Sequence, residues 1–460
     1  MHETTDAAGP PRRLLVWILV AVGLVALLAR GVFVAQVLSH LSAEQLLDYG
    51  PDTAQYVHLA RNLAFDGRYA QNDPTSHYTA LLRTPGYPAF VAIFLRLHWA
   101  PASVLVAQAA MASCIPLITA LLAWALLRSR LAALAAGMAS ALSPTGVGVT
   151  GIVLVEALFG VAFLLGFGLL YLGIAADRWR LACTAGVVFG VAALIKPTLL
   201  FWPVISPVLW FVLARATDRT VRWKPLLLFV VVQLPIPLAW CTHNYATDGF
   251  FALSSVGPQS LRYHIAPRVE EWARAGGMPR ADAVIRNRDT AKLRDEAEMA
   301  AGSPAADIIR RQTEESTPIL RANPRLTARL WLANIIENIR ETWPHFSTQL
   351  PEGSLSQRGW ERLSRALVRL QKPLLLLVVV AMLELLVRPR RRRSDAWRRQ
   401  LYGLLALAGT YGYFAFFTGI SYWQGSRLLY PVEFALILIV VIATVSLARS
   451  ARAAISSQSS

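Results

Sequence analysis

Apolar residues in this chain gather into long runs, separated by short polar or basic stretches. Runs of about twenty apolar residues match the thickness of a bilayer, where each backbone N–H and C=O must be paired within its own segment. We therefore predict an all-α polytopic membrane protein with about ten transmembrane helices. The predicted spans are Leu14–Val37, Ala102–Leu127, Leu131–Leu142, Ile152–Tyr171, Leu181–Ile195, Leu199–Leu213, Pro225–Trp240, Pro373–Val387, Leu401–Gly419 and Leu428–Leu447.

Composition and charge agree with this interpretation. The chain is 55% hydrophobic and 16% charged, with a net charge of +17. If the spans alternate, its basic clusters share one side, which the positive-inside rule assigns to the cytoplasm. We therefore predict a multi-pass membrane protein with cytoplasmic N and C termini; no nucleic-acid recognition fold accompanies the charge. The clusters are Arg12–Arg13, Arg128 with Arg130, Arg178 with Arg180, Arg215–Lys224, Arg388–Arg399, and Arg449 with Arg452.

Two longer stretches interrupt the spans on the outer side, and they divide the chain. We predict an N-terminal tail and first span in 1–38, where the apolar run is too long for a signal peptide. Residues 39–101 form an outer loop with interfacial helices, and 102–242 hold spans two to seven. Residues 243–372 form an extracytoplasmic helical domain, 373–447 hold spans eight to ten, and 448–460 are a cytoplasmic tail. Within the large domain we predict helices at Ala281–Ala301, Pro304–Arg321 and Pro324–Trp343, and the last two begin with a capping residue followed by proline.

The segment Gly50–Gly67 predicts an amphipathic interfacial helix, with Pro51 in its first turn and Gly67 at its end. Asp52 falls inside the apolar arc of this helix, one turn before Tyr56. An acid that only complemented the helix dipole would have no reason to lie among apolar residues. Asp52 is therefore a candidate catalytic residue, with the dipole role as the alternative.

Glu156 is the only charged residue between Ile152 and Tyr171. An acid inside a membrane helix costs about 2.5–3.5 kcal/mol on insertion scales, so such residues are usually functional. The alternative is a buried partner for a basic group in helix packing. By the predicted topology Glu156 and Asp52 share the outer leaflet, where they could converge and could hold a divalent metal cation through their oxygens.

Three basic residues stand on the outer side, where short segments should be poor in Lys and Arg. Each of them alone would be an ordinary end-of-helix residue. Together, at the leaflet of the two acids, they predict a phosphate site at headgroup depth. They are Arg83, Lys196 and Arg427.

Other patterns do not indicate a site. Gly146–Gly151 matches a dinucleotide-binding fingerprint, but it lies between two membrane spans without a strand–helix–strand context. The histidines lack the spacing of a metal site, and the three cysteines follow no CxxC pattern.

The residues singled out above belong to motifs that resemble the bacterial GT-C glycosyltransferases, the type that includes protein O-mannosyltransferases and lipid A aminoarabinose transferases. The order of the motifs and their membrane placement carry the resemblance, and His243 stands where we would expect arginine. The motifs are Asp52-x-x-x-Tyr56 with Ala60-Arg61-Asn62-Leu63, Arg83-x-Pro85-Gly86-Tyr87-Pro88, Leu154-Val155-Glu156-Ala157-Leu158-Phe159, Ile195-Lys196-Pro197-Thr198, Trp240-x-x-His243-Asn244-Tyr245 and Arg427-Leu428-Leu429-Tyr430-Pro431.

The resemblance implies a GT-C-like bundle in the bacterial cell (inner) membrane that transfers a sugar from a polyprenyl-phosphate carrier to an acceptor on the outer face, with inversion. Asp52 would be the base, and Glu156 would orient the acceptor or share a metal with Asp52. The acceptor would be a lipid, a glycan or a protein, and membrane lipids would be further partners. The implied substrate-binding residues are Tyr56, Arg83, Tyr87, Lys196, His243, Asn244, Arg427 and Tyr430.

Two other functions remain open from the sequence. A lipid-carrier flippase or transporter of envelope glycan precursors would place its acids deep within several spans, whereas these charges stand near the outer surface. A non-catalytic assembly protein would have a degenerate site, whereas both acids are present here.

Overall fold

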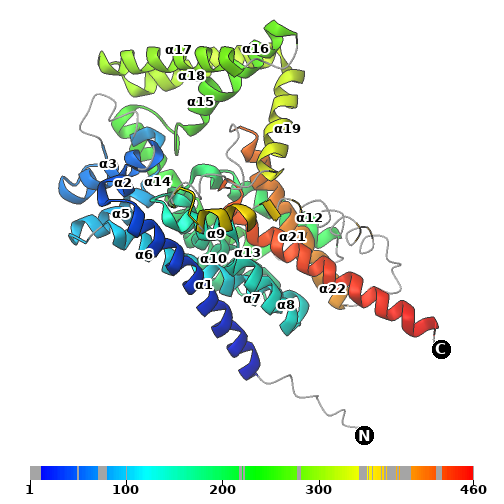
Figure 1. Cartoon of the computed structure of the whole chain (residues 1–460). Helices are drawn as coiled ribbons and strands as arrows, with labels where there is room; N and C mark the ends of the chain where they lie inside the picture. The colour runs from blue at the N-terminus through cyan, green and yellow to red at the C-terminus, as the bar shows by residue number, and fades with distance from the viewer. Residues whose placement is uncertain are drawn as a thin grey trace.

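The chain folds into a bundle of apolar helices with a second group of helices standing on one end (Figure 1). The computed structural model describes residues 12–48, 51–70, 80–99, 101–216, 223–276, 281–340, 395–420 and 427–458, together with residue 220 and short pieces of 350–383. Within these residues the secondary structure is helical and contains no β-strand, as the apolar runs predict.

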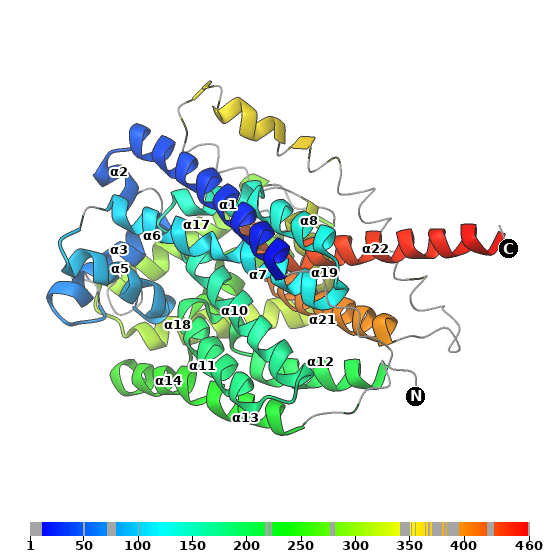
Figure 2. The same cartoon turned by 90° about the horizontal axis from the view of Figure 1, so that it is seen from below.

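The bundle is built from nine apolar regions of the described chain, and each coincides with a predicted span. Its helices are α1 (Arg12–His40), α6 (Ala102–Ala112) with α7 (Cys114–Leu127), α8 (Arg130–Ala141), α10 (Val155–Ala175), α11 (Trp179–Ile195), α12 (Trp202–Ala216), α13 (Trp223–Gln233) with α14 (Pro235–Asp248), α21 (Asp395–Thr418) and α22 (Glu433–Gln458). Seen from below, α1, α7 and α8 lie together, and α12, α13 and α14 form the opposite edge (Figure 2).

Length and hydropathy identify six spans among the described helices, or seven if the bent pair Arg130–Ala141 and Pro144–Gly151 counts as one. The pair bends by 51° where Ser143 and Pro144 begin α9 (Pro144–Gly148). Helices α11 and α12 are apolar but shorter. The predicted span Pro373–Val387 lies largely outside the described residues. The chain is thus a multi-pass membrane protein, and about ten spans fit its pattern.

Aromatic packing fixes the spans that surround α10. The ring of Phe163 lies 5.4 Å from Phe189 of α11, 5.7 Å from Trp202 of α12 and 4.9 Å from Phe414 of α21, measured between ring centroids. All four side chains are buried. Edge-to-face contacts of this kind stabilise a packed core beyond simple burial. Helix α10 therefore packs against α11, α12 and α21 two turns after Glu156, which lies in its first turn.

A second group of helices, which we call the outer unit, covers residues 256–340 and stands over one end of the bundle (Figure 1). It contains α15 (Val256–Ser260), the π-helix η3 (Leu261–Ile265), α16 (Ala266–Ala275), α17 (Ala281–Ala300), α18 (Ala305–Ala322) and α19 (Pro324–Arg340). The last three agree with the predicted helices to within a few residues at each end.

The outer unit is joined to the bundle through α19. The indole N–H of Trp331 donates to the carbonyl of Phe416 at 3.0 Å, and the amide of Asn334 donates to the carbonyl of Gly419 at 3.0 Å. The last carbonyls of a helix lack partners within it, so these side chains complete the end of α21.

Candidate active site

A cavity of about 270 Å³ lies between the bundle and the outer unit. Its bundle side is lined by the predicted charged residues, which come from α3 (Pro51–Phe65), the segment before α5 (Gly86–Arg96), the start of α10, the end of α11 and the segment before α22. They are Asp52, Arg83, Glu156, Lys196 and Arg427. The structure thus brings together five residues that are up to 375 positions apart.

Asp52 lies in the first turn of α3, as the sequence predicts. In the turns that follow, Tyr56, Val57 and Leu59 are buried at 6% exposure or less, while 35% of the Asp52 side chain remains exposed. Its carboxylate pairs with the guanidinium of Arg83 through Oδ1 and with Nη2 of Arg427 through Oδ2, at 2.9 Å. Burial alone would raise the pKa of Asp52, but the charges of Arg83 and Arg427 outweigh it and hold the pKa well below the usual carboxyl range.

Arg83 is held in place by α3. Its Nε donates to Oε1 of Gln55 at 2.8 Å, its Nη1 donates to the hydroxyl of Tyr56 at 3.3 Å, and the guanidinium lies 4.9 Å from the centroid of the Tyr56 ring. Burial raises the pKa of Tyr56 to about 12, so its hydroxyl remains protonated at neutral pH. Tyr56 therefore serves Arg83 as a neutral hydrogen-bonding and cation–π support.

The backbone after Arg83 packs tightly on the end of α11. Thr84 donates its hydroxyl to the carbonyl of Ile195 at 3.0 Å. A Cβ at Gly86 would lie only 2.7 Å from the carbonyl oxygen of Leu194, so this close approach requires glycine. These contacts place Arg83 beside Lys196, which follows Ile195 directly. They explain why threonine and glycine follow Arg83 at these positions of the Arg83-Thr84-Pro85-Gly86 motif.

Glu156 lies in the first turn of α10 and is 1% exposed. Its Oε1 accepts from Nε of Arg427 at 2.8 Å and lies 3.5 Å from Nζ of Lys196. Its Oε2 accepts no hydrogen bond from any described residue. Glu156 therefore holds two cations at the cavity wall, and this matches the alternative reading of a buried partner as well as a role in the site.

The two acids do not form a convincing metal site. Arg427 donates to both Asp52 and Glu156, so its guanidinium takes the position that a bridging cation would take. Two further cations, Arg83 and Lys196, surround the same pair. Among the described residues no group of three or more His, Cys, Asp or Glu side chains could hold a metal. The two carboxylates are therefore better suited to pairing with arginine and lysine than to binding a divalent cation.

Four residues that the resemblance implied lie outside the cavity lining. Tyr87 is fully buried behind Tyr56, with ring centroids 5.1 Å apart, and its hydroxyl donates to Gln108. Tyr430 is buried between α9 and α10. In α14, His243 is exposed and stacks on Trp240, while Asn244 donates to the carbonyl of Ala252 at 2.8 Å.

The rest of the cavity lining includes residues that the sequence did not single out. Gln259, Ser260 and His264 reach it from α15 and η3, and Phe414, Phe417 and Thr418 reach it from α21. A π-helix has no sequence signature, so no pattern in 256–265 marked this segment in advance.

We compared the chain with known proteins. No protein-family model matches the chain, and no curated protein matches it. Among solved structures it is similar to the Archaeoglobus fulgidus oligosaccharyltransferase tethered with an acceptor peptide, at 14% identity and a TM-score of 0.50, covering 94% of this chain. It is also similar to ArnT from Cupriavidus metallidurans bound to undecaprenyl phosphate, at 15% identity and a TM-score of 0.41, covering 95% of this chain and 78% of that one.

The chain spans 49% of the length of the oligosaccharyltransferase that it matches. At this identity the likeness concerns the fold, which is the one that the motifs predicted. The chain has a multi-pass, all-α fold similar to that of the oligosaccharyltransferase, in agreement with the bundle that the sequence predicted.

Proposed function

We propose that this protein is a glycosyltransferase that moves a sugar from a polyprenyl-phosphate donor to an acceptor on the outer face of the bacterial inner membrane. One observation carries the proposal: three cations and two carboxylates from distant segments line one cavity at an end of the membrane bundle. Outside the cytoplasm there is no nucleotide-sugar pool, so the activated donor has to be carried by the membrane.

The three cations fit the leaving group of such a donor. Arg83, Lys196 and Arg427 give the cavity one positive charge more than Asp52 and Glu156 neutralise. A phosphate that leaves with developing negative charge is stabilised by donors already fixed in place, and arginine pairs with phosphate through two parallel hydrogen bonds. Asp52 pairs with both arginines, so a phosphate would compete with its carboxylate for them.

Donor binding would thereby prepare the base. A phosphate competes with Asp52 for Arg83 and Arg427, and the carboxylate then loses the charges that depress its pKa. Asp52 can next accept the proton of an acceptor hydroxyl or amine while the acceptor atom bonds to the anomeric carbon. The bond from that carbon to the phosphate oxygen breaks, and polyprenyl phosphate leaves with the electron pair.

Glu156 supports a single displacement with inversion at the anomeric carbon. A retaining reaction would need a second carboxylate to attack the sugar. Glu156 is 1% exposed and paired with Arg427 and Lys196, so it is suited to hold cations and not to attack a substrate. We assign it the role of positioning Arg427 and Lys196, and the acceptor is a lipid, a glycan or a protein.

A transfer assay tests the proposal. Purified protein in lipid nanodiscs is incubated with radiolabelled polyprenyl-phosphate sugars and with lipid, glycan or peptide acceptors. We expect a labelled product from one donor with the wild type and almost none with Asp52→Asn. Equal product from both proteins would contradict the assignment of Asp52 as base.

A further inference from the structure

The cavity has two chemically different sides. The bundle side carries the five charged residues, whereas the side formed by the outer unit carries neutral polar groups. We call Gln259, Ser260 and His264 the polar roof; all three line the cavity from α15 and η3. Burial, together with the charges of Arg288 and Arg268, lowers the pKa of His264 to about 4, so its imidazole is neutral at neutral pH.

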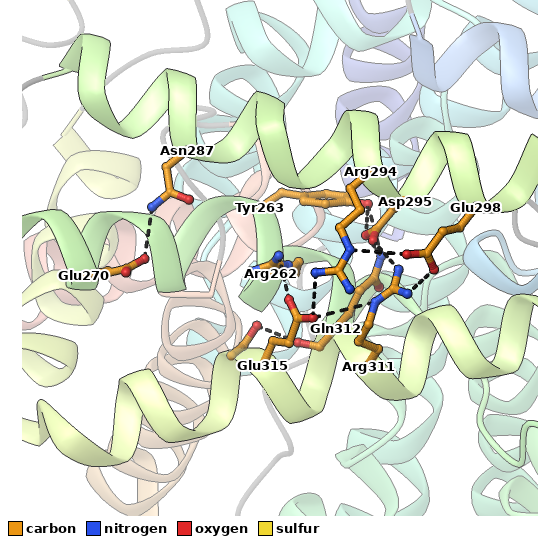
Figure 3. Close-up of polar contacts among 11 residues, drawn as sticks. Arg262, Tyr263, Glu270, Asn287, Arg294, Asp295, Glu298, Arg311, Gln312 and Glu315 are labelled. Carbon is orange, nitrogen blue, oxygen red and sulfur yellow. Dashed lines mark hydrogen bonds and ion pairs between the residues drawn. The ribbon is translucent and has the colours of Figure 1, made fainter.

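Hydrogen bonds and ion pairs support the polar roof on the side that faces away from the cavity. Residues of the same π-helix that do not line the cavity enter a polar network between α17 and α18 (Figure 3). The hydroxyl of Tyr263 donates to Oδ2 of the buried Asp295 at 2.6 Å, and Arg262 pairs with Glu315 at 2.7 Å. Ser260, at the end of α15, and His264, in η3, both line the cavity.

The roof is also tied to the charged side of the cavity. Ser254 donates its hydroxyl to the carbonyl of Leu82 at 2.6 Å, and the N–H of Ser255 donates to the carbonyl of Leu81 at 2.9 Å. Leu82 precedes Arg83 directly. The segment that leads into the roof is therefore fixed relative to the residue that we assign to the phosphate.

Neutral polar groups suit a different part of the donor from the cations. An amide, a hydroxyl and a neutral imidazole each donate and accept hydrogen bonds, which is the pattern that sugar hydroxyl groups offer in return. None of them attracts a phosphate by charge. The rings of Phe414 and Phe417 complete the cavity with apolar surface, as in most small-molecule sites, where a few polar groups fix the orientation of the ligand.

We propose that the polar roof binds the sugar of the lipid-linked donor, and that Gln259 and His264 determine which sugar is accepted. This proposal rests on the proposed function, because the phosphate on Arg83, Lys196 and Arg427 places the attached sugar beneath the roof. A site built to pair hydroxyl groups discriminates strongly against a ligand that leaves those groups unpaired.

A binding experiment separates the sugar from the phosphate. Full-length protein in nanodiscs is titrated with polyprenyl monophosphate and with the same lipid carrying glucose, mannose, galactose or arabinose, all without acceptor. For the best-bound sugar lipid we expect Gln259→Leu and His264→Leu each to weaken binding about three- to ten-fold, the effect of one lost hydrogen bond. Binding of the sugar-free lipid should not change.

Two further variants make the result decisive. His264→Gln keeps a neutral hydrogen-bonding group and should retain more affinity than His264→Leu, and it serves where the leucine variant fails to fold. His58→Leu makes the same change on an exposed face of α3 and should alter neither titration. Equal losses for both lipids, or no loss for the sugar lipid, would overturn the assignment of the roof.

The same titration tests the proposed function independently. Arg427→Ala should weaken binding of the sugar-free lipid as well as of the sugar lipid. If Arg427→Ala changes the binding of neither lipid, the assignment of the phosphate site is wrong. If Arg427→Ala behaves as expected and the roof variants bind like the wild type, only the sugar assignment fails.

Discussion

Nη2 of Arg427 lies 2.9 Å from Oδ2 of Asp52, although 375 positions separate the two residues. The same guanidinium donates through Nε to Glu156. One arginine thus links the start of α3, the start of α10 and the segment before α22. The four other charged residues of the cavity therefore lie around this side chain.

Asp52→Asn should abolish most of the transfer activity. The amide keeps the shape of the carboxylate but cannot accept a proton, and a general base typically contributes about 10²–10⁴-fold. We expect kcat to fall at least by the lower figure, while the affinity for polyprenyl phosphate stays the same or rises because the arginines lose a competitor. Steady-state kinetics and lipid titration measure the two effects. A variant that is fully active and only slightly less stable would support the helix-dipole role instead.

Glu156→Gln should be milder than Asp52→Asn. The change removes an anion that orients Arg427 and Lys196 but leaves the base in place. We expect a higher KM for the donor and a smaller loss of kcat, and the ratio of the two separates positioning from direct chemistry. A loss as large as that of Asp52→Asn would place Glu156 in the chemical step.

Gly86→Ala should reduce activity without removing any functional group. The added Cβ meets the carbonyl of Leu194, so the segment has to shift and Arg83 shifts with it. Overpacking of this kind typically costs about 1–3 kcal/mol. The matched control is Gly31→Ala, where nothing lies within 4 Å of the added atom. We expect the control to retain the wild-type thermal stability and turnover; equal effects at both positions would contradict the packing argument.

Chelation of divalent metals should leave the activity unchanged. Arg427 already lies between the two carboxylates, so the paired acids need no bridging metal. Transfer assays with and without EDTA, followed by addition of Mg²⁺ or Mn²⁺, test this directly. Activity that disappears with EDTA and returns with one metal would show that Arg427 leaves this position in the working enzyme.

Topology reporters test the predicted orientation. Fusions after Arg130, Arg222 and Arg399 should report the cytoplasm, because these sites follow the basic clusters. Fusions within Asp282–Asn338 should report the outside. A cytoplasmic signal from the outer unit would place the cavity in the compartment that holds nucleotide sugars. The main reason to infer a lipid-linked donor would then be gone.

The sequence predicted the bundle well because the requirement to pair backbone groups in lipid leaves few alternatives to helices. It also singled out Asp52 and Glu156, because acids in apolar surroundings are costly, and it singled out Arg83, Lys196 and Arg427, because basic residues are unusual in short outer segments. The structure places these five around one cavity.

The roof could not be found in the same way. Gln259, Ser260 and His264 are ordinary polar residues, and no pattern in the sequence shows that α15 and η3 place them at the cavity. Motif membership was also too coarse for Tyr87, which supports Tyr56 from the core and does not line the cavity. Proximity in a motif does not fix the direction of a side chain.

The contact between α19 and the end of α21 has a consequence for protein engineering. Trp331, Asn334 and Asn338 provide hydrogen bonds to the carbonyls of Phe416, Gly419 and Thr418, at the end of the helix that also carries the aromatic wall of the cavity. An outer unit exchanged between two such proteins would remove these side-chain donors unless the end of α21 came with it, and among the described residues only the carbonyl of Phe416 would keep a donor, the N–H of Gly419 at 3.2 Å. Chimaeras should therefore be joined within the N-terminal half of α21, so that α19 and the C-terminal end of α21 come from the same parent protein.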